Sequence, residues 1–260
     1  RIITRLQNPD NRGGLQLTCA TLAAFTKYPR ESWLGGSLFP GVGAKKFGFV
    51  AEDRELFEEV ADTVGLIRLD ARHAIWCRHP LAFLVEAADD ISYRVIDIED
   101  GFRLGYLSLS DVEELFLAVV GDDARLKARL RQLSDDKGKV EFLRAKVINR
   151  AVSQTVSCFL DSETPILQGA QQAPVMASLA ARASMDRLVE VAREHIYCAP
   201  EVVGIQAAGF QVIGDLLERF VEALDDLAER GSAATPRSQM LSQLVPQQFK
   251  GGRTGIAGGP

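Results

Sequence analysis

The amino-acid sequence predicts an all-α protein. In several long segments, apolar residues recur at the 3.6-residue period of an α-helix. Prolines and acidic residues stand at the starts of these segments, where a helix tolerates a missing N–H and favours negative charge. Alternation with a period of two, which would indicate a half-buried strand, is almost absent. Together these observations favour a helical assembly over a sheet.

Local start and stop signals delimit the expected helices. Pro29 ends the first of them, and Gly65 is a C-cap for the second. Pro80 stands in the first turn of the third, and Ser110 with Glu113 predicts a capping box for a helix that follows it. The expected helices cover residues 15–25, 52–64, 78–101, 123–133, 137–160, 174–194 and 201–229.

Three segments lack helical patterning. The glycine-rich residues 35–49 are expected to form a loop, and 45–49 within it a turn or short strand. This loop lacks the GxxxxGK[ST] pattern of a phosphate-binding P-loop. Residues 231–236 are small and polar, which predicts another loop. We expect weak order in 243–260.

Composition excludes several classes of protein. The chain has 260 residues, of which 47% are hydrophobic, and a net charge of −5, which suits a globular protein without general affinity for nucleic acid or anionic membrane. No apolar run approaches the roughly 18 residues that span a bilayer. No signal-peptide pattern is expected, and the cytoplasm is the predicted compartment. The scattered cysteines lack CxxC spacing, so they are expected to be buried, reduced thiols: Cys19, Cys77, Cys158 and Cys198.

One segment carries residues suited to chemistry. Asp89, Tyr93 and Asp97 follow one another at intervals of four, and each interval turns a helix by about 40°, so the three share one face. A carboxylate can bind a divalent metal, and a phenol with a second carboxylate can hydrogen-bond a sugar hydroxyl or a phosphate. The alternative is a solvated face, which acidic residues on amphipathic helices usually form. Asp90 and Arg94 fit that alternative as a surface pair.

Several short blocks occur in the order and at the spacings of one enzyme family. His-Pro-Leu at 79–81 precedes Glu-Ala-Ala-Asp-Asp-Ile-Ser-Tyr at 86–93. Further blocks lie at 14–18, 20–24, 27–29, 45–48, 196–197 and 209–220. With these blocks, most of the chain resembles the dGTPase-like HD-domain triphosphohydrolases.

The resemblance implies hydrolysis of a deoxynucleoside triphosphate (dNTP) to a deoxynucleoside and inorganic triphosphate. The family's metal site uses a His, a His-Asp pair and a distant Asp, and Asp89 corresponds to that distant Asp. Tyr93 and Asp97 then contact the deoxyribose, and Lys27 with Tyr28 lies near the phosphates. The resemblance also implies a divalent metal (Mg, Mn or another transition metal) and a homo-oligomer.

The chain departs from the family pattern in its histidines. His73, His79 and His195 precede alanine, proline and isoleucine, so no His-Asp dipeptide is present. We therefore expect a truncated HD-type assembly with the other metal ligands and all catalytic residues upstream, and an inactive chain when alone. Residues 1–165 are then the latter part of the catalytic domain, and 166–260 a C-terminal helical region with a weakly ordered tail. The alternatives are another HD-type phosphohydrolase and a non-catalytic module that binds nucleotide or single-stranded DNA.

Other residues have functional and structural interpretations. Arg144 and Lys146, with Arg150, form a basic group on one predicted helix, which fits a regulatory nucleotide or nucleic-acid site or a solvated face. His79 is expected to cap or pack at a helix start, whereas His195 stands at a helix end, where a cation suits the helix dipole. The two tryptophans are expected to be core or interface anchors: Trp33 and Trp76.

Overall fold

The computed structural model describes residues 2–8, 11, 13–33, 46–121 and 123–246. Within these residues the regular elements are helices, and extended pairing is limited to isolated bridges such as the one between Arg30 and Ile75. The prediction of an all-α protein is confirmed. The chain divides into two compact units, one formed by Thr18–Ala199 and the other by Arg1–Leu17 with Pro200–Pro260. The domain boundary after residue 165 stays a prediction.

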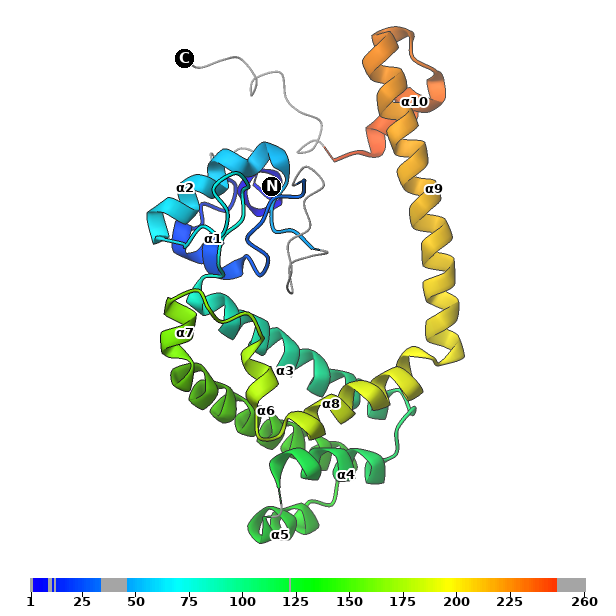
Figure 1. Ribbon diagram of the computed structural model, residues 1–260. Helices are drawn as coiled ribbons and strands as arrows, with labels where there is room; N and C mark the ends of the chain where they lie inside the picture. Colours follow the sequence, from blue (N-terminus) through cyan, green and yellow to red (C-terminus); the bar gives the residue numbers. More distant parts are fainter. Residues whose placement is uncertain (1, 9–10, 12, 34–45, 122, 247–260) are drawn as a thin grey trace. The chain divides into compact units, whose positions relative to one another are not determined.

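The larger unit contains a succession of helices and single helical turns (Figure 1). In chain order they are α1 (Cys19–Phe25), η2 (Ala51–Asp53), α2 (Arg54–Val64), α3 (Pro80–Arg103), α4 (Leu109–Val120), α5 (Ala124–Gln132), α6 (Asp136–Asp161), α7 (Glu163–Leu167), η3 (Val175–Ser178), α8 (Arg182–Val191) and the π-helical η4 (Ala192–Tyr197).

The main core of this unit lies where α3, α4, α6 and α8 pack against one another. Each of these helices turns an apolar stripe inward, as the 3.6-residue period predicts. Burying that apolar surface is the main force that holds the helices together. The core side chains with no more than 1% exposure include Val95, Ile98, Val112, Phe116, Leu143, Val147, Met185 and Leu188.

A smaller aromatic core holds the segments around α2. The rings of Phe49 and Phe57 stack with centroids 4.3 Å apart, and the Trp76 ring lies 5.4 Å from Phe57. Trp76 is 3% exposed, which confirms its prediction as a core anchor, whereas Trp33 is 70% exposed and is no part of the core. Lys45 and the glycine-rich residues 34–44 lie outside the described residues.

The start of α3 follows the sequence signals. Pro80 is its first residue, and His79 caps it by accepting a hydrogen bond at Nδ1 from the Leu81 N–H, at 3.2 Å. Gly65 ends α2 in the left-handed conformation, with φ of 69°. These predicted boundaries are therefore confirmed, because caps act through neighbouring residues alone.

The capping box of α4 lies two residues before the predicted one. Ser108 accepts a hydrogen bond from the Asp111 N–H, and the Asp111 carboxylate accepts one from the Ser108 N–H at 2.8 Å. The prediction of Ser110 with Glu113 was wrong, because Ser110 already lies in the first turn of the helix.

Two further predictions differ from the structure. Residues 174–194 do not form one helix: Leu179 is extended between η3 and α8, and the chain continues as the π-helical η4. The short helices α7 and α10 (Pro236–Leu244) were not predicted. Of the four cysteines, which are all free, only Cys77 is buried and Cys198 is exposed.

The smaller unit contains the π-helical turn η1 (Ile2–Leu6), the long helix α9 (Pro200–Arg230), η5 (Gly231–Ala233) and α10. α10 packs on α9 near Ala223, which is 3% exposed. Elsewhere α9 exposes large apolar side chains, among them Phe210 at 85%. No single helix of the described residues is long and apolar enough to span a membrane; one bent pair of helices reaches that length and composition only when joined. Residues 247–260, where weak order was expected, lie outside the described residues.

Candidate functional site

One face of α3 is polar although the helix is built into the core. At about 100° per residue, Glu86, Tyr93 and Asp97 fall within about 40° of one another, and Asp89 stands about 60° to one side of Glu86. Glu86 is buried, Asp97 is half-buried, and Asp89 and Tyr93 are exposed. The row of Asp89, Tyr93 and Asp97 expected from the spacing is therefore present, with Glu86 as an addition.

Glu86 lies between two cations at the start of this face. Lys27 Nζ is 3.0 Å from Glu86 Oε1, and Arg78 Nη1 is 2.7 Å from Oε2. The Glu86 side chain is only 4% exposed, and such a charge is tolerated in the interior only when it is paired. Burial, the largest single influence, lowers the pKa of Lys27, but the hydrogen bond to Glu86 and the charges of Glu86, Tyr28 and Asp90 together outweigh it, so the pKa is raised. Lys27 therefore stays charged at neutral pH.

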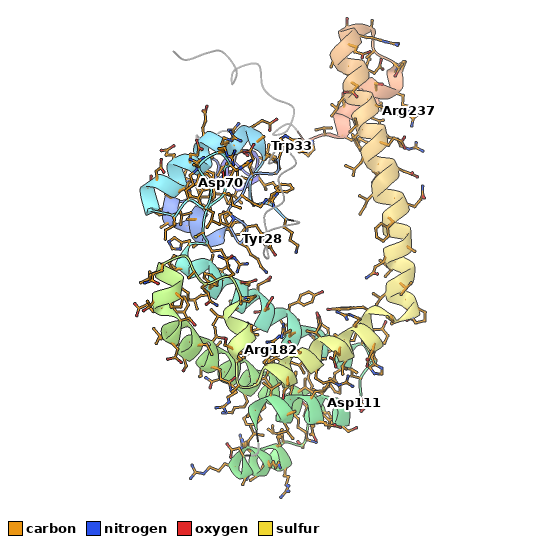
Figure 2. The ribbon with its side chains drawn as sticks, viewed as in Figure 1. Tyr28, Trp33, Asp70, Asp111, Arg182 and Arg237 are labelled. Atoms are coloured by element: carbon orange, nitrogen blue, oxygen red, sulfur yellow. The ribbon has the colours of Figure 1, made fainter. Side chains whose placement is uncertain are left out.

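A further cation, Lys46, lies over the Tyr28 ring at this end of the site. Lys46 Nζ lies 5.4 Å from the centre of the Tyr28 ring, and Lys27 Nζ lies 5.7 Å from it. Both distances suit an attraction between a cation and an aromatic face. Figure 2 labels Tyr28 in this region of the larger unit. Two cations, Lys27 and Arg78, thus pair with one buried carboxylate, and Lys46 lies over the neighbouring Tyr28 ring, an accumulation of positive charge that suits an anionic ligand.

The other end of the polar face is a cluster of two phenols and a carboxylate. The Tyr197 hydroxyl donates a hydrogen bond to Asp97 Oδ2, and the Tyr93 and Tyr197 rings lie 6.4 Å apart. Burial raises the pKa of Asp97, and the Tyr197 hydroxyl works against that rise. Burial and the neighbouring Asp97 also raise the pKa of Tyr197, which is therefore a neutral donor. Tyr197 closes the π-helical η4, and such π-helical turns frequently occur at functional sites.

Asp89 is exposed on this face of α3. Among the described residues, no group of three or more His, Cys, Asp or Glu side chains could hold a metal ion. His79 caps α3, and His73 Nδ1 lies 2.8 Å from Asp70. A single exposed carboxylate does not fit a divalent metal, so the donor set of this chain is insufficient by itself.

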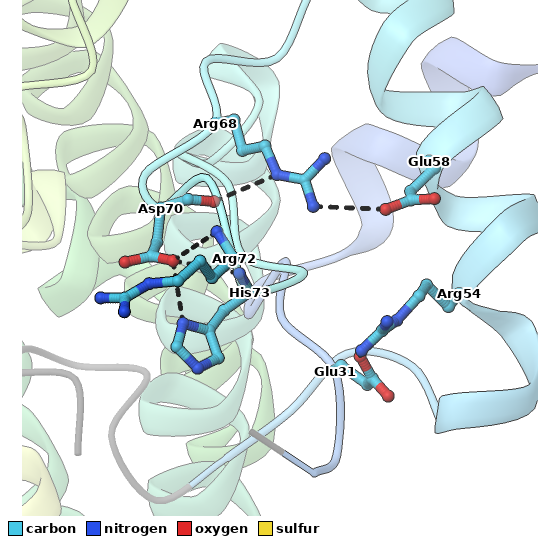
Figure 3. Close-up of polar contacts among 7 residues, drawn as sticks. All are labelled: Glu31, Arg54, Glu58, Arg68, Asp70, Arg72 and His73. Carbon is cyan, nitrogen blue, oxygen red and sulfur yellow. Dashed lines mark hydrogen bonds and ion pairs between the residues drawn. The ribbon is translucent and has the colours of Figure 1, made fainter. Parts of the chain in front are cut away.

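Figure 3 shows the polar contacts of a tight turn at Asp70, in the segment that leads from α2 to Arg78. Asp70 Oδ1 accepts hydrogen bonds from the backbone N–H groups of Arg72 and His73, at 2.8 and 3.0 Å. The first of these bonds contributes most to the lowered pKa of Asp70. Arg68 donates to Glu58 at 3.3 Å and lies over the Trp76 ring at 5.1 Å. These contacts fix the segment between α2 and α3, at the end of which Arg78 stands.

Comparison with known proteins identifies the chain. No family model matches it. A deoxyguanosinetriphosphate triphosphohydrolase-like protein of Synechocystis sp. is 39% identical over 254 residues, which cover 96% of this chain and 55% of that relative. The chain belongs to the deoxyguanosinetriphosphate triphosphohydrolase-like family.

Other members of the family also match this chain over about half of their own length. A Pseudomonas aeruginosa relative with the same description is 35% identical over 76% of this chain and 44% of its own length. The deoxyguanosinetriphosphate triphosphohydrolase of Salmonella paratyphi A is 30% identical over 78% of this chain and 42% of its own length. The chain thus spans about half the length of the curated relatives it matches.

The predicted regulatory residues of this triphosphohydrolase-like chain do not lie together. Arg144 binds both carboxylate oxygens of Glu99, at 2.8 and 2.7 Å, whereas Lys146 lies over the Phe142 ring at 5.4 Å. Arg144 and Lys146 stand two positions apart on α6, so their side chains point about 160° away from each other around the helix. Arg150 is exposed. Their assignment to a regulatory nucleotide stays a prediction.

Four residues of the site have no role predicted from the sequence. Lys46, Tyr197 and Glu86 lie in the blocks that resemble the family, but the sequence assigned them no role. Arg78 had no assigned role either. Glu86 precedes Tyr93 by seven residues, two turns of a helix, so the periodicity that selected Tyr93 and Asp97 could also have selected it. No local signal indicated that Arg78 and Lys27 meet at Glu86.

Proposed function

We propose that the full-length protein hydrolyses a deoxynucleoside triphosphate, dGTP or another dNTP, to a deoxynucleoside and inorganic triphosphate. The observation that carries this proposal is the order of groups along one face of α3. The cations around Glu86 stand at one end of this face. Asp97 stands about 16 Å from Glu86 along the helix axis, and Tyr93 lies between them. A charged end and a sugar-sized polar end match the two parts of a nucleotide.

The phosphates occupy the cationic end in this proposal. Lys27 is 34% exposed, so its ammonium group can reach a ligand while it remains bonded to Glu86. Lysine acts as a point charge that spreads over several phosphate oxygens, and charge-assisted hydrogen bonds of this kind are the strong ones. Tyr28 keeps the cations close together through its ring. This chain supplies phosphate binding but no catalytic acid or base.

The deoxyribose occupies the end with Tyr93 and Asp97. A carboxylate accepts a hydrogen bond from a sugar hydroxyl, and phenol rings pack against the apolar side of a sugar. Tyr197 donates to Asp97 and so holds its carboxylate in one orientation. In this proposal a tyrosine ring packed against the sugar excludes the bulkier 2′-hydroxyl of a ribose, which favours a deoxyribose.

Asp89 contributes one metal ligand in the full-length protein, and the remaining ligands and the catalytic residues come from the half of the protein outside this chain. The relatives are about twice as long as the part they share with this chain, which is consistent with that division. A divalent metal (Mg, Mn or another transition metal) held there would supply polarisation of a phosphoryl oxygen or activation of water. We expect this chain alone to be inactive.

Product analysis of the full-length protein tests the proposal. We expect release of deoxynucleoside and intact triphosphate from at least one dNTP with Mg²⁺ or Mn²⁺. Asp89→Ala lowers this rate by about a thousandfold or more, because a bound metal would lower the activation barrier by several kcal/mol. Asp100→Ala is the matched control, since Asp100 is also exposed on α3 but lies about 16 Å further along the axis. Absence of turnover for every dNTP, or equal losses in both variants, contradicts the proposal.

We further propose that the full-length protein is a cytoplasmic homo-oligomer. The exposed apolar side chains of α9 support an interface between copies, because large exposed apolar patches mark interaction sites. The alternative, a non-catalytic module that binds nucleotide or single-stranded DNA, predicts ligand binding by the full-length protein without turnover.

A further inference from the structure

We propose that Glu86 is a positioning residue that, together with the buried Arg78, orients Lys27 for the triphosphate. This inference rests on the proposed function, because it assigns the arrangement of cations at the phosphate end of that site. Glu86 itself does not touch the substrate, since its side chain is 4% exposed and both of its oxygens are occupied.

The first support is the geometry of the carboxylate. Each oxygen has its own cation, with Lys27 Nζ at 3.0 Å and Arg78 Nη1 at 2.7 Å. A buried carboxylate is strongly destabilising when it loses a partner, so the two cations are held where Glu86 requires them. The orientation of Lys27 is therefore set by α3 and not by the lysine side chain, which is flexible by itself.

The second support is that the three residues come from three segments. Lys27 follows α1, Arg78 precedes α3 and Glu86 lies in the second turn of α3. Arg78 also lies over the Phe83 ring at 5.2 Å, and its side chain is 10% exposed. Arg78 is thus the buried anchor of the cluster, whereas Lys27, at 34% exposure, is the cation that faces the ligand.

A second buried carboxylate on α3, Glu99, makes it possible to distinguish the orientation of Lys27 from the general stabilisation that a buried ion pair provides. The Glu99 side chain is 8% exposed and is held by Arg144 of α6 at 2.7 Å. Glu99 stands thirteen positions after Glu86, so the two side chains point about 140° away from each other around the helix. Both carboxylates join α3 to another segment through a cation, but only Glu86 holds a lysine that reaches the polar face. Glu99→Gln is therefore the matched control for Glu86→Gln.

The experiment compares two inhibitors of dNTP hydrolysis by the full-length protein, inorganic triphosphate and a deoxynucleoside. Glutamine cannot hold two cations, so Lys27 loses its orientation in Glu86→Gln. We expect the inhibition constant of triphosphate and the KM of the dNTP to rise about tenfold, the effect of one charge-assisted hydrogen bond. The inhibition constant of the deoxynucleoside and the kcat change less. In Glu99→Gln neither inhibitor is affected.

Three results overturn the proposal: equal losses for both inhibitors in Glu86→Gln, no loss for triphosphate, or the same selective loss in Glu99→Gln. If Glu86→Gln does not fold, Glu86→Asp replaces it, because the shorter carboxylate keeps its charge but cannot reach both cations. We expect Glu86→Asp to show the same selective loss of triphosphate affinity. A triphosphate affinity equal to that of the wild type would overturn the proposal.

Failure of the proposed function is distinguishable from failure of this inference. If the full-length wild type hydrolyses no dNTP, calorimetric titration with inorganic triphosphate and with deoxynucleoside makes the same comparison among wild type, Glu86→Gln and Glu99→Gln. Selective loss of triphosphate binding in Glu86→Gln supports the role of Glu86 in anion binding, and unchanged binding overturns it.

Discussion

The two faces of α3 illustrate different uses of one helix. On the core face, Ile91, Val95 and Ile98 are no more than 3% exposed and pack against α4, α6 and α8. On the polar face, Glu86 and Asp97 are held by Lys27 and Tyr197. Apolar packing tolerates exchange between residues of similar volume, whereas a buried carboxylate depends on one specific partner. The core face therefore determines stability, and we expect the polar face to determine ligand binding.

The largest expected effect belongs to the core face. Ile98→Ala removes a fully buried side chain, and we expect the free energy of unfolding to fall by about 2–5 kcal/mol. Urea denaturation followed by circular dichroism measures this change. The matched control is Ile96→Ala, since Ile96 is 45% exposed on the same helix and its loss costs about 0.5 kcal/mol or less. Equal losses for both variants would contradict the assignment of the two faces.

A smaller, selective effect is expected at the polar face. Tyr197→Phe keeps the ring but removes the hydrogen bond to Asp97, so the inhibition constant of a deoxynucleoside rises about tenfold in the full-length protein. The inhibition constant of inorganic triphosphate is expected not to change, so the selectivity of this variant is opposite to that of Glu86→Gln. Tyr106→Phe serves as control, because Tyr106 packs against the main core and lies outside the polar face. A selective loss for triphosphate in Tyr197→Phe would reverse the assignment of the two ends.

The smallest expected effect concerns the first turn of α3. Burial lowers the pKa of His79 below its ordinary 6.5, so the unfolded chain binds the proton more tightly than the folded protein. The stabilisation by neutral His79 is complete above pH 6.5 and is lost as the pH falls through 6.5 towards the folded pKa. Protonation also removes the acceptor that caps Leu81.

We expect this loss to reach about 1 kcal/mol, the usual contribution of an N-cap. His79→Asn keeps a capping acceptor that does not titrate, so the difference in unfolding free energy between wild type and variant should change between pH 7 and pH 5. A constant difference over that range would exclude a role for His79 as a titrating cap. The two proteins differ only at position 79, so the difference between them reports on that residue.

The sequence by itself determined the all-α class, most helices of the larger unit and the row of Asp89, Tyr93 and Asp97. Periodicity, Pro80 and Gly65 were sufficient because helix initiation, termination and amphipathicity depend on neighbours within a few residues. The family resemblance came from the same source, since its motifs are short and local. These signals identified the polar face of α3 but not the partners of its side chains.

Only the tertiary structure decided those partners. Tyr197 reaches Asp97 across 100 positions of sequence, and Lys27 and Arg78 converge on Glu86 from separate segments. The engagement of Arg144 by Glu99 likewise depends on how α6 packs on α3. Periodicity assigns a residue to a face of its own helix. The packing of helices decides which cation or phenol binds a buried carboxylate. A buried charge is tolerated only where another segment brings such a partner within hydrogen-bonding reach.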